Sequence, residues 1–257
     1  MLRLNVEAQA QAIKSMEQAR LLGAALQQHG SSHAHLSDML IDGRAGVAKD
    51  VKRAFELATA GAALDCAHSK GVLGFCYAYD CGVAMDEARG LALGRESEAA
   101  GSCFGQDVVG VCYRFGCGGV AQDDAEAARL FRLAAEQGYA RAQISLGVMF
   151  DCGLGVAQDT AEAIRWYRLA AEQGNAYAQV DLGNTFEYGR GVAQDLAEAI
   201  RYYRLAAEQG HAEAQYRLGV MFEHGEGVAQ DTAEAIRLYR LAAAQGDAEA
   251  QKRLDAL

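Results

Sequence analysis

The 257-residue sequence contains no proline, whereas average usage would place about 13 prolines in a chain of this length. Glycine is not scarce, with 29 residues. The absence of proline excludes collagen-like sequence, polyproline II segments and proline-rich linkers. A chain that never uses proline to stop or bend its backbone is predicted to consist of helices joined by short glycine turns.

The sequence also lacks long apolar runs and an excess of positive charge. No stretch approaches 18 consecutive apolar residues, which excludes a membrane-spanning helix. The first 30 residues lack a basic start followed by an apolar core and a cleavage site, so no secretory signal is predicted. The net charge of −10 disfavours nucleic acid and anionic membrane surfaces as partners and leaves basic or neutral partners open. With 51% hydrophobic and 23% charged residues, the composition is that of a globular protein.

An internal repeat sets the architecture. The pattern Gly-Val-Ala-x-Asp occurs six times, with successive starts 36, 37, 36, 36 and 36 residues apart. The copies begin at Gly46, Gly82, Gly119, Gly155, Gly191 and Gly227. The one extra residue falls in the glycine-rich turn that precedes Gly119.

Each repeat begins with one predicted helix, which in the fourth copy runs from Ala140 to about Cys152. Ala142, Leu146 and Phe150 are spaced i, i+4, i+8 and therefore share one face. Gly147 lies in mid-helix and recurs in the next two repeats. Because a helical glycine costs about 1 kcal/mol relative to alanine, its recurrence predicts a close approach of another helix.

The second predicted helix of the same repeat follows a glycine turn. Asp159 is a favourable N-cap, and Glu162 three residues later predicts a capping box. The helix carries Tyr167 on its alanine-rich face and ends at Gly174, a residue type that commonly terminates helices.

One such helix pair cannot bury its apolar faces alone, but stacked pairs can. The predicted fold is all-α, an α-solenoid superhelix of about six antiparallel helix-turn-helix repeats of 36 residues with terminal capping helices. Residues 1–29 are predicted to form an N-terminal capping helix, and residues 30–257 the repeat array. Residues 247–257 repeat the start of a first helix and are predicted to form a half-repeat cap.

Residues 142–174 carry a pattern with Ala-x-Ala-Gln, Leu-Gly, Phe, Gly-x-Gly-Val and Asp, followed by a Trp-Tyr helix that ends Ala-Ala-Glu-Gln-Gly. This pattern resembles the Sel1-like repeat. The resemblance covers about residues 30–257, is strongest in the last three repeats and departs at Ser37-Asp38, which stand where Leu-Gly is expected. It implies a solenoid related to tetratricopeptide arrays and a role as an adaptor or scaffold.

The helix face opposite the recurring apolar positions is predicted to line a concave groove that binds a partner. Its residues differ between repeats but remain rich in aromatic and charged side chains, a composition typical of binding surfaces. The predicted groove residues are Phe104, Asp107, Arg114, Phe115, Arg141, Ile144, Asp151, Tyr177, Val180, Asn184, Glu187, Tyr188, Glu213, Tyr216, Glu223 and His224.

Asp151, Glu187 and Glu223 occupy one position in three successive repeats and are predicted to form an acidic ladder. Such a ladder favours a basic or amide-rich extended peptide. The alternative is a solvated acidic face whose aromatic side chains pack against neighbouring repeats.

The cysteine pattern favours free thiols. There are seven cysteines, and no neighbouring pair has the eight-residue separation of the disulfides in secreted Sel1-like proteins. An odd count without a signal sequence predicts a reducing compartment, the cytoplasm. Cys76/Cys81 and Cys112/Cys117 could contribute to a zinc site, but buried apolar cysteine is the favoured interpretation.

The histidine run at residues 29–35 contains His33-Ala34-His35, a potential metal chelator, in a segment interpreted as a linker with solvated histidines. Neither a metal nor a cofactor is predicted. The sequence contains no Gly-x-Ser-x-Gly, phosphate-loop or His-Glu-x-x-His motif, so no catalytic residue is assigned and no enzyme is predicted.

The predicted function is a protein–protein interaction scaffold that binds a peptide or protein segment in the groove. The alternatives are a hydrolase or antibiotic-binding Sel1-like protein, and a purely structural, self-associating array. The oligomeric state is left open.

Overall fold

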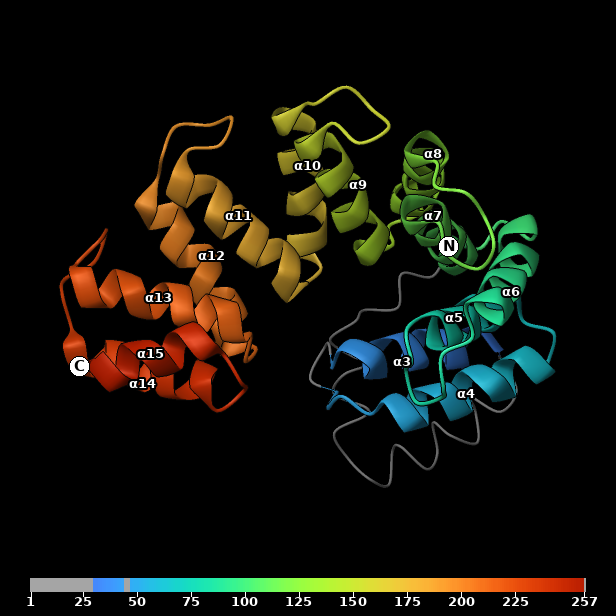
Figure 1. Ribbon diagram of the computed structural model, residues 1–257, viewed down its shortest axis with the longest axis horizontal. Helices are drawn as coiled ribbons and strands as arrows, with labels where there is room; N and C mark the ends of the chain where they lie inside the picture. The colour runs from blue at the N-terminus through green and yellow to red at the C-terminus, as the bar shows by residue number, and fades with distance from the viewer. Residues whose placement is uncertain (1–29, 44–46, 257) are drawn as a thin grey trace. The chain divides into compact units, whose positions relative to one another are not determined.

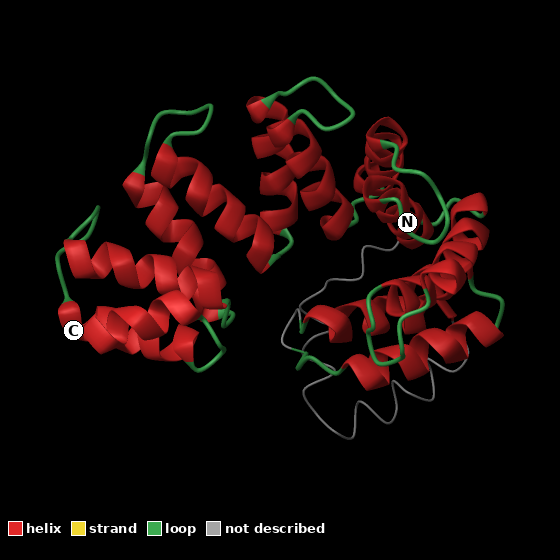
Figure 2. Cartoon of the chain, viewed as in Figure 1, coloured by secondary structure: helices red, strands yellow, loops and turns green. Residues whose placement is uncertain are grey.

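The computed structural model describes residues 30–43 and 47–256. Its described part consists of helices joined by turns and contains no strand (Figures 1 and 2). The helices are α3 (Gly30–Asp42), α4 (Val51–Ala63), α5 (Ala67–Ala78), α6 (Glu87–Ala99), α7 (Cys103–Phe115), α8 (Asp124–Glu136), α9 (Ala140–Cys152), α10 (Thr160–Glu172), α11 (Ala176–Tyr188), α12 (Leu196–Glu208), α13 (Ala212–His224), α14 (Thr232–Ala243) and α15 (Ala248–Ala256). The capping helix predicted at residues 1–29 lies outside the described residues.

The helix boundaries agree with the predicted repeat. The fourth copy has its helices at Ala140–Cys152 and Thr160–Glu172, and Gly174 ends the second of them in the left-handed conformation, with φ of +81°. Consecutive helices pack as pairs, α3 with α4, α5 with α6, α7 with α8, α11 with α12 and α13 with α14. The prediction of an all-α repeat array is confirmed, and α15 occupies the residues predicted as the C-terminal half-repeat.

The chain divides into two compact units. The first unit is Met1–Leu146 with Leu154–Ala157, and the second unit is Gly147–Gly153 with Gln158–Leu257. The division falls within α9, so the start of this helix belongs to the first unit and its end to the second.

An aspartate caps the second helix of each pair. The side chain accepts a backbone N–H from the first turn in every case. The six caps are Asp50, Asp86, Asp123, Asp159, Asp195 and Asp231.

The predicted reciprocal half of the capping box is wrong. The N–H of Asp159 donates instead to the carbonyl of Phe150, at 2.9 Å, across the turn. With that donor already satisfied, Glu162 accepts from Nε of Arg165 at 3.1 Å. The aspartate therefore both starts its own helix and ties it to the end of the preceding one.

Residues 30–35 of the histidine run belong to a helix and not to a linker, contrary to the sequence interpretation, whereas His29 lies outside the described residues. Gly30 begins α3, and the hydroxyl of Ser69 in α5 donates to the Gly30 carbonyl at 2.8 Å. His33 is buried in the helix pair, whereas His35 is exposed. Packing against α4 and α5 thus keeps a helix where glycine and serine residues disfavour one in isolation.

Gly147 makes the close contact that its recurrence predicts. A Cβ atom at this position would lie 2.5 Å from Cε1 of Tyr167 on the facing helix α10. The same tyrosine position faces Gly183 and Gly219 in the next two repeats. The glycine therefore admits a buried aromatic ring between the two helices of a pair.

Replacing Gly147 with alanine is expected to lower the free energy of unfolding by about 1–2 kcal/mol. The overpacking cost of about 1–3 kcal/mol exceeds the gain in helix propensity. Urea denaturation measures the loss, and Val148→Ala at the next, exposed position is the matched control, expected within about 0.5 kcal/mol of wild type. A Gly147→Ala protein as stable as wild type would show that the ring does not fill this space.

Candidate functional site

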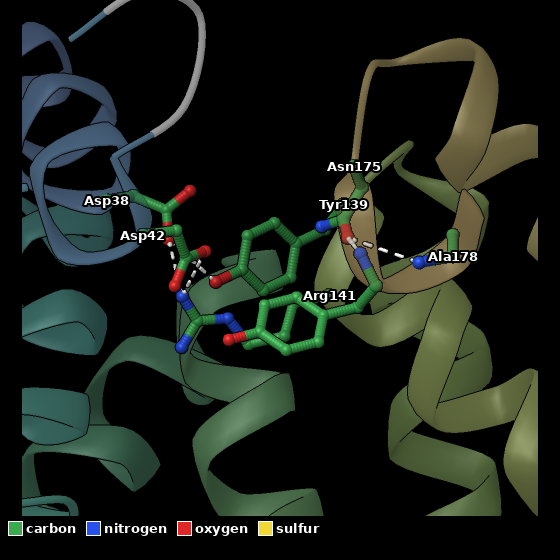
Figure 3. Close-up of polar contacts among 7 residues, drawn as sticks. Asp38, Asp42, Tyr139, Arg141, Asn175 and Ala178 are labelled. Atoms are coloured by element: carbon green, nitrogen blue, oxygen red, sulfur yellow. Dashed lines mark hydrogen bonds and ion pairs between the residues drawn. The ribbon is translucent and has the colours of Figure 1, made fainter. Parts of the chain in front are cut away.

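In the first unit, the start of α9 is joined to α3 by a buried polar cluster (Figure 3). The Tyr139 hydroxyl donates to Oδ1 of Asp38 at 2.9 Å, although the two residues are 101 positions apart. Nη2 of Arg141 donates to Oδ2 of Asp42 at 2.9 Å and lies 3.5 Å from Oδ1 of Asp38. The cluster thereby joins the first helix of the first pair to the first helix of the fourth.

Aromatic rings surround this cluster. The guanidinium of Arg141 lies 3.9 Å from the ring centre of Phe75 in α5. Phe104 in α7 packs at 4.9 Å against Tyr139 and at 5.6 Å against both His35 and His68. The rings cover much of the ion pairs, whose side chains are left 10–21% exposed, and this reduced contact with water strengthens the electrostatic attraction within them.

Asp107 in α7 is the acidic group that this arrangement leaves without a hydrogen bond. Its side chain is 1% exposed, and neither carboxyl oxygen has a hydrogen-bond partner among the described residues. The adjoining crevice is too narrow to admit a water molecule. Burial therefore raises the pKa of Asp107 to about 7, against the opposing attraction of Arg141.

These contacts restrict the groove predicted in the first unit. Phe104 and Asp107 are buried, and Arg141 is engaged with Asp42. Arg114 pairs with Asp124 at 3.3 Å and lies over Phe115, which is 69% exposed. Ile144 is half-buried. Because Phe104 and Asp107 are buried, they do not belong to a surface that a partner could contact.

In the second unit, the start of α11 presents an exposed tyrosine from a fixed backbone. Oδ1 of Asn175 accepts the N–H groups of Tyr177, at 3.0 Å, and Ala178, at 3.4 Å, so this side chain caps the helix (Figure 3). Tyr177 is 60% exposed, yet its ring packs edge-on against His211 at 4.8 Å. Tyr177 is therefore both accessible and restrained.

The end of α11 presents a second exposed tyrosine. Tyr188 is 49% exposed, and Nη1 of Arg217 in α13 donates to its hydroxyl at 2.6 Å. The guanidinium of Arg190 lies 5.3 Å from the centre of the ring. Arg217 of α13 and Arg190 of the turn after α11 thus hold the orientation of this side chain.

Two members of the predicted acidic ladder are occupied by contacts with other helices of the chain. Glu187 accepts from the Tyr203 hydroxyl at 2.5 Å. Glu223 accepts from the Tyr239 hydroxyl at 2.6 Å and lies 3.3 Å from Nη1 of Arg253. Two of the three carboxylates are therefore acceptors for buried tyrosines rather than free groups. The signal missed in the sequence is the recurrence of a tyrosine 16 residues after each of these acids.

A different acidic group lies on this part of the second unit. The carboxylates of Glu213 and Asp151 act on Asp181, whose pKa is raised to about 7 by its burial and by their repulsion, against the attraction of Arg190. Glu213 is exposed and Asp151 half-buried. Asp181 on α11 is thus repelled by an acid on α9 and an acid on α13, a repulsion that an added positive charge would relieve.

The other predicted residues of the second unit differ in accessibility. Val180 is buried, and Asn184 accepts from the Tyr203 hydroxyl at 2.6 Å. Tyr216 is half-buried with its ring 5.9 Å from that of Tyr239, whereas His224 is exposed. No group of three or more histidine, cysteine or acidic side chains among the described residues is placed to hold a metal ion.

A family model described as Sel1 repeat matches five segments of the chain, residues 30–66, 105–139, 140–175, 176–211 and 212–247. The unmatched stretch between the first two segments contains α5 and α6, which nevertheless pack as a helix pair. No curated protein matches the sequence.

Several solved structures are similar. A protective antigen of uropathogenic Escherichia coli strains, with an SLR fold, is 32% identical with a TM-score of 0.64; the match covers 91% of this chain and 50% of that one. This chain thus spans about half the length of the antigen. A Sel1 repeat protein from Oxalobacter formigenes is 29% identical with a TM-score of 0.69, over 93% of this chain and 69% of that one. The immunity protein Pa5087 from Pseudomonas aeruginosa, 18% identical with a TM-score of 0.57 over 84% of this chain and 81% of that one, shares the fold.

Within residues 30–43 and 47–256, each helix is too short or too polar to cross a membrane.

Proposed function

Because the chain belongs to the Sel1 repeat family, whose members are generally protein-interaction scaffolds, we propose that it is a non-catalytic scaffold. It binds an extended segment of a partner protein along the first helices of the second unit. The contact surface is the exposed tyrosine pair, Tyr177 and Tyr188, with the acidic group Asp151, Asp181 and Glu213.

The observation that carries this proposal is the combination of exposure and restraint at the two tyrosines. Tyrosine is among the residues that contribute most to binding at interfaces. Tyr177 is held by His211 and Tyr188 by Arg217, so little side-chain freedom remains to be lost when a partner binds. Both belong to α11, so one helix sets the distance between them.

The acidic group defines the kind of partner. A lysine or arginine near Asp181 would offset the repulsion from Glu213 and Asp151. The net charge of −10 would also speed the approach of a basic segment at low ionic strength. The proposed ligand is therefore a basic segment that also carries apolar side chains for the tyrosines.

The proposed compartment is the cytoplasm. All seven cysteines are free thiols, and Cys76 and Cys112 are fully buried. Burial raises the pKa of Cys76 to about 12, which keeps this thiol protonated and unreactive. A reducing compartment suits such a chain.

Selection from a phage-displayed library of random peptides tests the proposal without knowledge of the natural partner. Peptides selected on the wild-type protein are expected to be rich in lysine and arginine. Their affinity for a Tyr177→Ala/Tyr188→Ala protein should fall by about tenfold or more, since each tyrosine anchor is worth 1 kcal/mol or more.

The matched control is Leu169→Ala/Leu205→Ala. These leucines are exposed to 36% and 38% on α10 and α12, the second helices of their pairs. The control should bind the selected peptides as wild type does. Equal binding to both double variants, or selected peptides without basic residues, would contradict the proposal.

A further inference from the structure

The second unit contains a cleft on its second helices, away from the tyrosine pair. It lies between α12 and α14, has α13 as its floor and encloses about 670 Å³. Leu218 and Phe222 line the floor. Arg204 of α12 and Arg237 of α14 stand at its sides, with Leu238 and Leu241. Glu208, Asp231 and Glu234 also line the cleft, which therefore combines an apolar base with guanidinium and carboxylate groups at its edges.

The preceding helix pair shows what occupies the corresponding place. Tyr202 of α12 stacks on Phe186 of α11, with ring centres 5.9 Å apart and planes inclined by 6°. The guanidinium of Arg201 covers the tyrosine ring at 4.0 Å. One repeat earlier, Arg165 covers Trp166 in the same way, at 4.6 Å. An aromatic ring thus lies beneath an arginine in both pairs.

The last pair has Leu238 at this position, 36 residues after Tyr202. Leucine is smaller than tyrosine or tryptophan and presents no ring to a guanidinium. Phe150 and Phe186 are each 8% exposed, whereas Phe222 is only partly buried. Arg237 stands where Arg165 and Arg201 stand, pairs with Glu234 at 2.7 Å and keeps 59% of its side chain exposed. The phenylalanine and the arginine are retained, and the buried side chain of Leu238, 2% exposed, stands in place of the aromatic ring.

We propose that this cleft binds an aromatic side chain of a partner protein. That ring takes the place on Phe222 and beneath Arg237 which Tyr202 takes on Phe186 and beneath Arg201. Stacking on phenylalanine and cation–π attraction to arginine both favour a ring over an aliphatic side chain. The site is lined by α12, α13 and α14, whereas Tyr177 and Tyr188 lie on α11, so the proposal does not depend on the function proposed for those residues.

Titration with N-acetyl-L-tyrosinamide, monitored by NMR of leucine methyl groups, tests this site in the full chain. The methyl signals of Leu218, Leu238 and Leu241 are expected to shift in a saturable manner. N-acetyl-L-leucinamide should bind about three- to tenfold more weakly, the difference that one aromatic contact makes.

Two reciprocal variants separate filling the site from disturbing the fold. Leu238→Trp places in the last pair the residue that the repeat already accepts at Trp166, and it should reduce tyrosinamide binding by about tenfold or more. Tyr202→Leu creates the residue set of the last pair one repeat earlier. It should add a second site, seen as new shifts at Leu182 and Leu205. Circular dichroism and the dispersion of the methyl signals verify that both variants are folded.

The proposal is overturned if tyrosinamide causes no saturable shift, or if leucinamide binds as tightly. Unchanged binding to Leu238→Trp would also overturn it, as would a folded Tyr202→Leu protein without a second site. A selective loss in the first variant and a gain in the second support it together, because only occupancy of the ring position predicts opposite effects.

Discussion

Replacing Arg141 with alanine is expected to lower the free energy of unfolding of the first unit by about 3–5 kcal/mol, the usual cost of removing one partner from a buried ion pair. The guanidinium lies among three carboxyl groups, those of Asp38, Asp42 and Asp107. Without it, Asp42 loses its 2.9 Å hydrogen bond and the Phe75 ring loses the cation above it.

Urea denaturation followed by circular dichroism measures this loss, while the fluorescence of the single tryptophan, Trp166, reports on the second unit. Because stability in repeat arrays arises from each repeat and its neighbours, the Trp166 transition should move less than the total signal. Arg53→Ala is the control, since its pair with Glu56 in the first unit is exposed and is worth about 1 kcal/mol or less.

A double-mutant cycle with Asp42→Asn tests the cause. If the ion pair accounts for the loss, the double variant should be more stable than the sum of the single effects predicts, by about 1 kcal/mol or more. A loss below 1 kcal/mol for Arg141→Ala, or additive effects in the cycle, would show that the cluster does not stabilise the contact between α3 and α9.

The period of the sequence was sufficient to predict the helices and their caps. Gly-Val-Ala-x-Asp fixes where each pair turns, and the aspartate caps depend only on residues within four positions. Gly147 and its equivalents indicated a close helix approach, although the tyrosine that uses the space was not identified. Local signals of this kind survive because each repeat contacts only its neighbours.

The polar cluster could not be predicted in the same way. Asp38 appeared in the sequence only as a departure from the expected glycine, and its partners lie about 100 residues away. A periodic pattern describes the residues that the repeats share. The polar cluster is instead made from residues that differ between the first four repeats. The unexpected aspartate was the available signal, because a charged residue at a packing position requires a partner.

The groove prediction failed to separate surface from interior for a related reason. Phe104, Asp107 and Val180 occupy the same helix face as Tyr177, yet they are buried. Helical spacing assigns residues to a face but does not say what covers that face. Glu187 and Glu223 show the same limit, since their tyrosine partners belong to the next helix of the pair.

The second large effect expected in the first unit concerns Asp107 and pH. The pKa of Asp107 is about 7 in the folded protein, whereas an unfolded aspartate titrates near 4. Between these values the folded state holds a proton that the unfolded state has released, so stability falls as the pH rises through this window and levels off above about 7. Asp107→Asn cannot ionise. It is expected to be more stable than wild type by about 2–4 kcal/mol at pH 8 and by only about 1–1.5 kcal/mol at pH 5, where the folded carboxyl is still protonated but the unfolded one is already ionised.

The measurement is the difference in unfolding free energy between wild type and Asp107→Asn at several pH values from 5 to 8. The effects of other titrating groups on stability cancel in this difference. They include His68 and His211, whose pKa values are lowered by burial, so that each of them makes stability rise with pH. Asp181→Asn is the matched control, because the pKa of Asp181 is also about 7 but the residue lies in the second unit. It should leave the pH dependence due to Asp107 in place.

A difference that does not change with pH would mean that Asp107 is not buried as a carboxylate at pH 8. A difference that grows when Arg141 is also replaced would connect the two predictions, since the guanidinium is the group that keeps the Asp107 pKa from rising further.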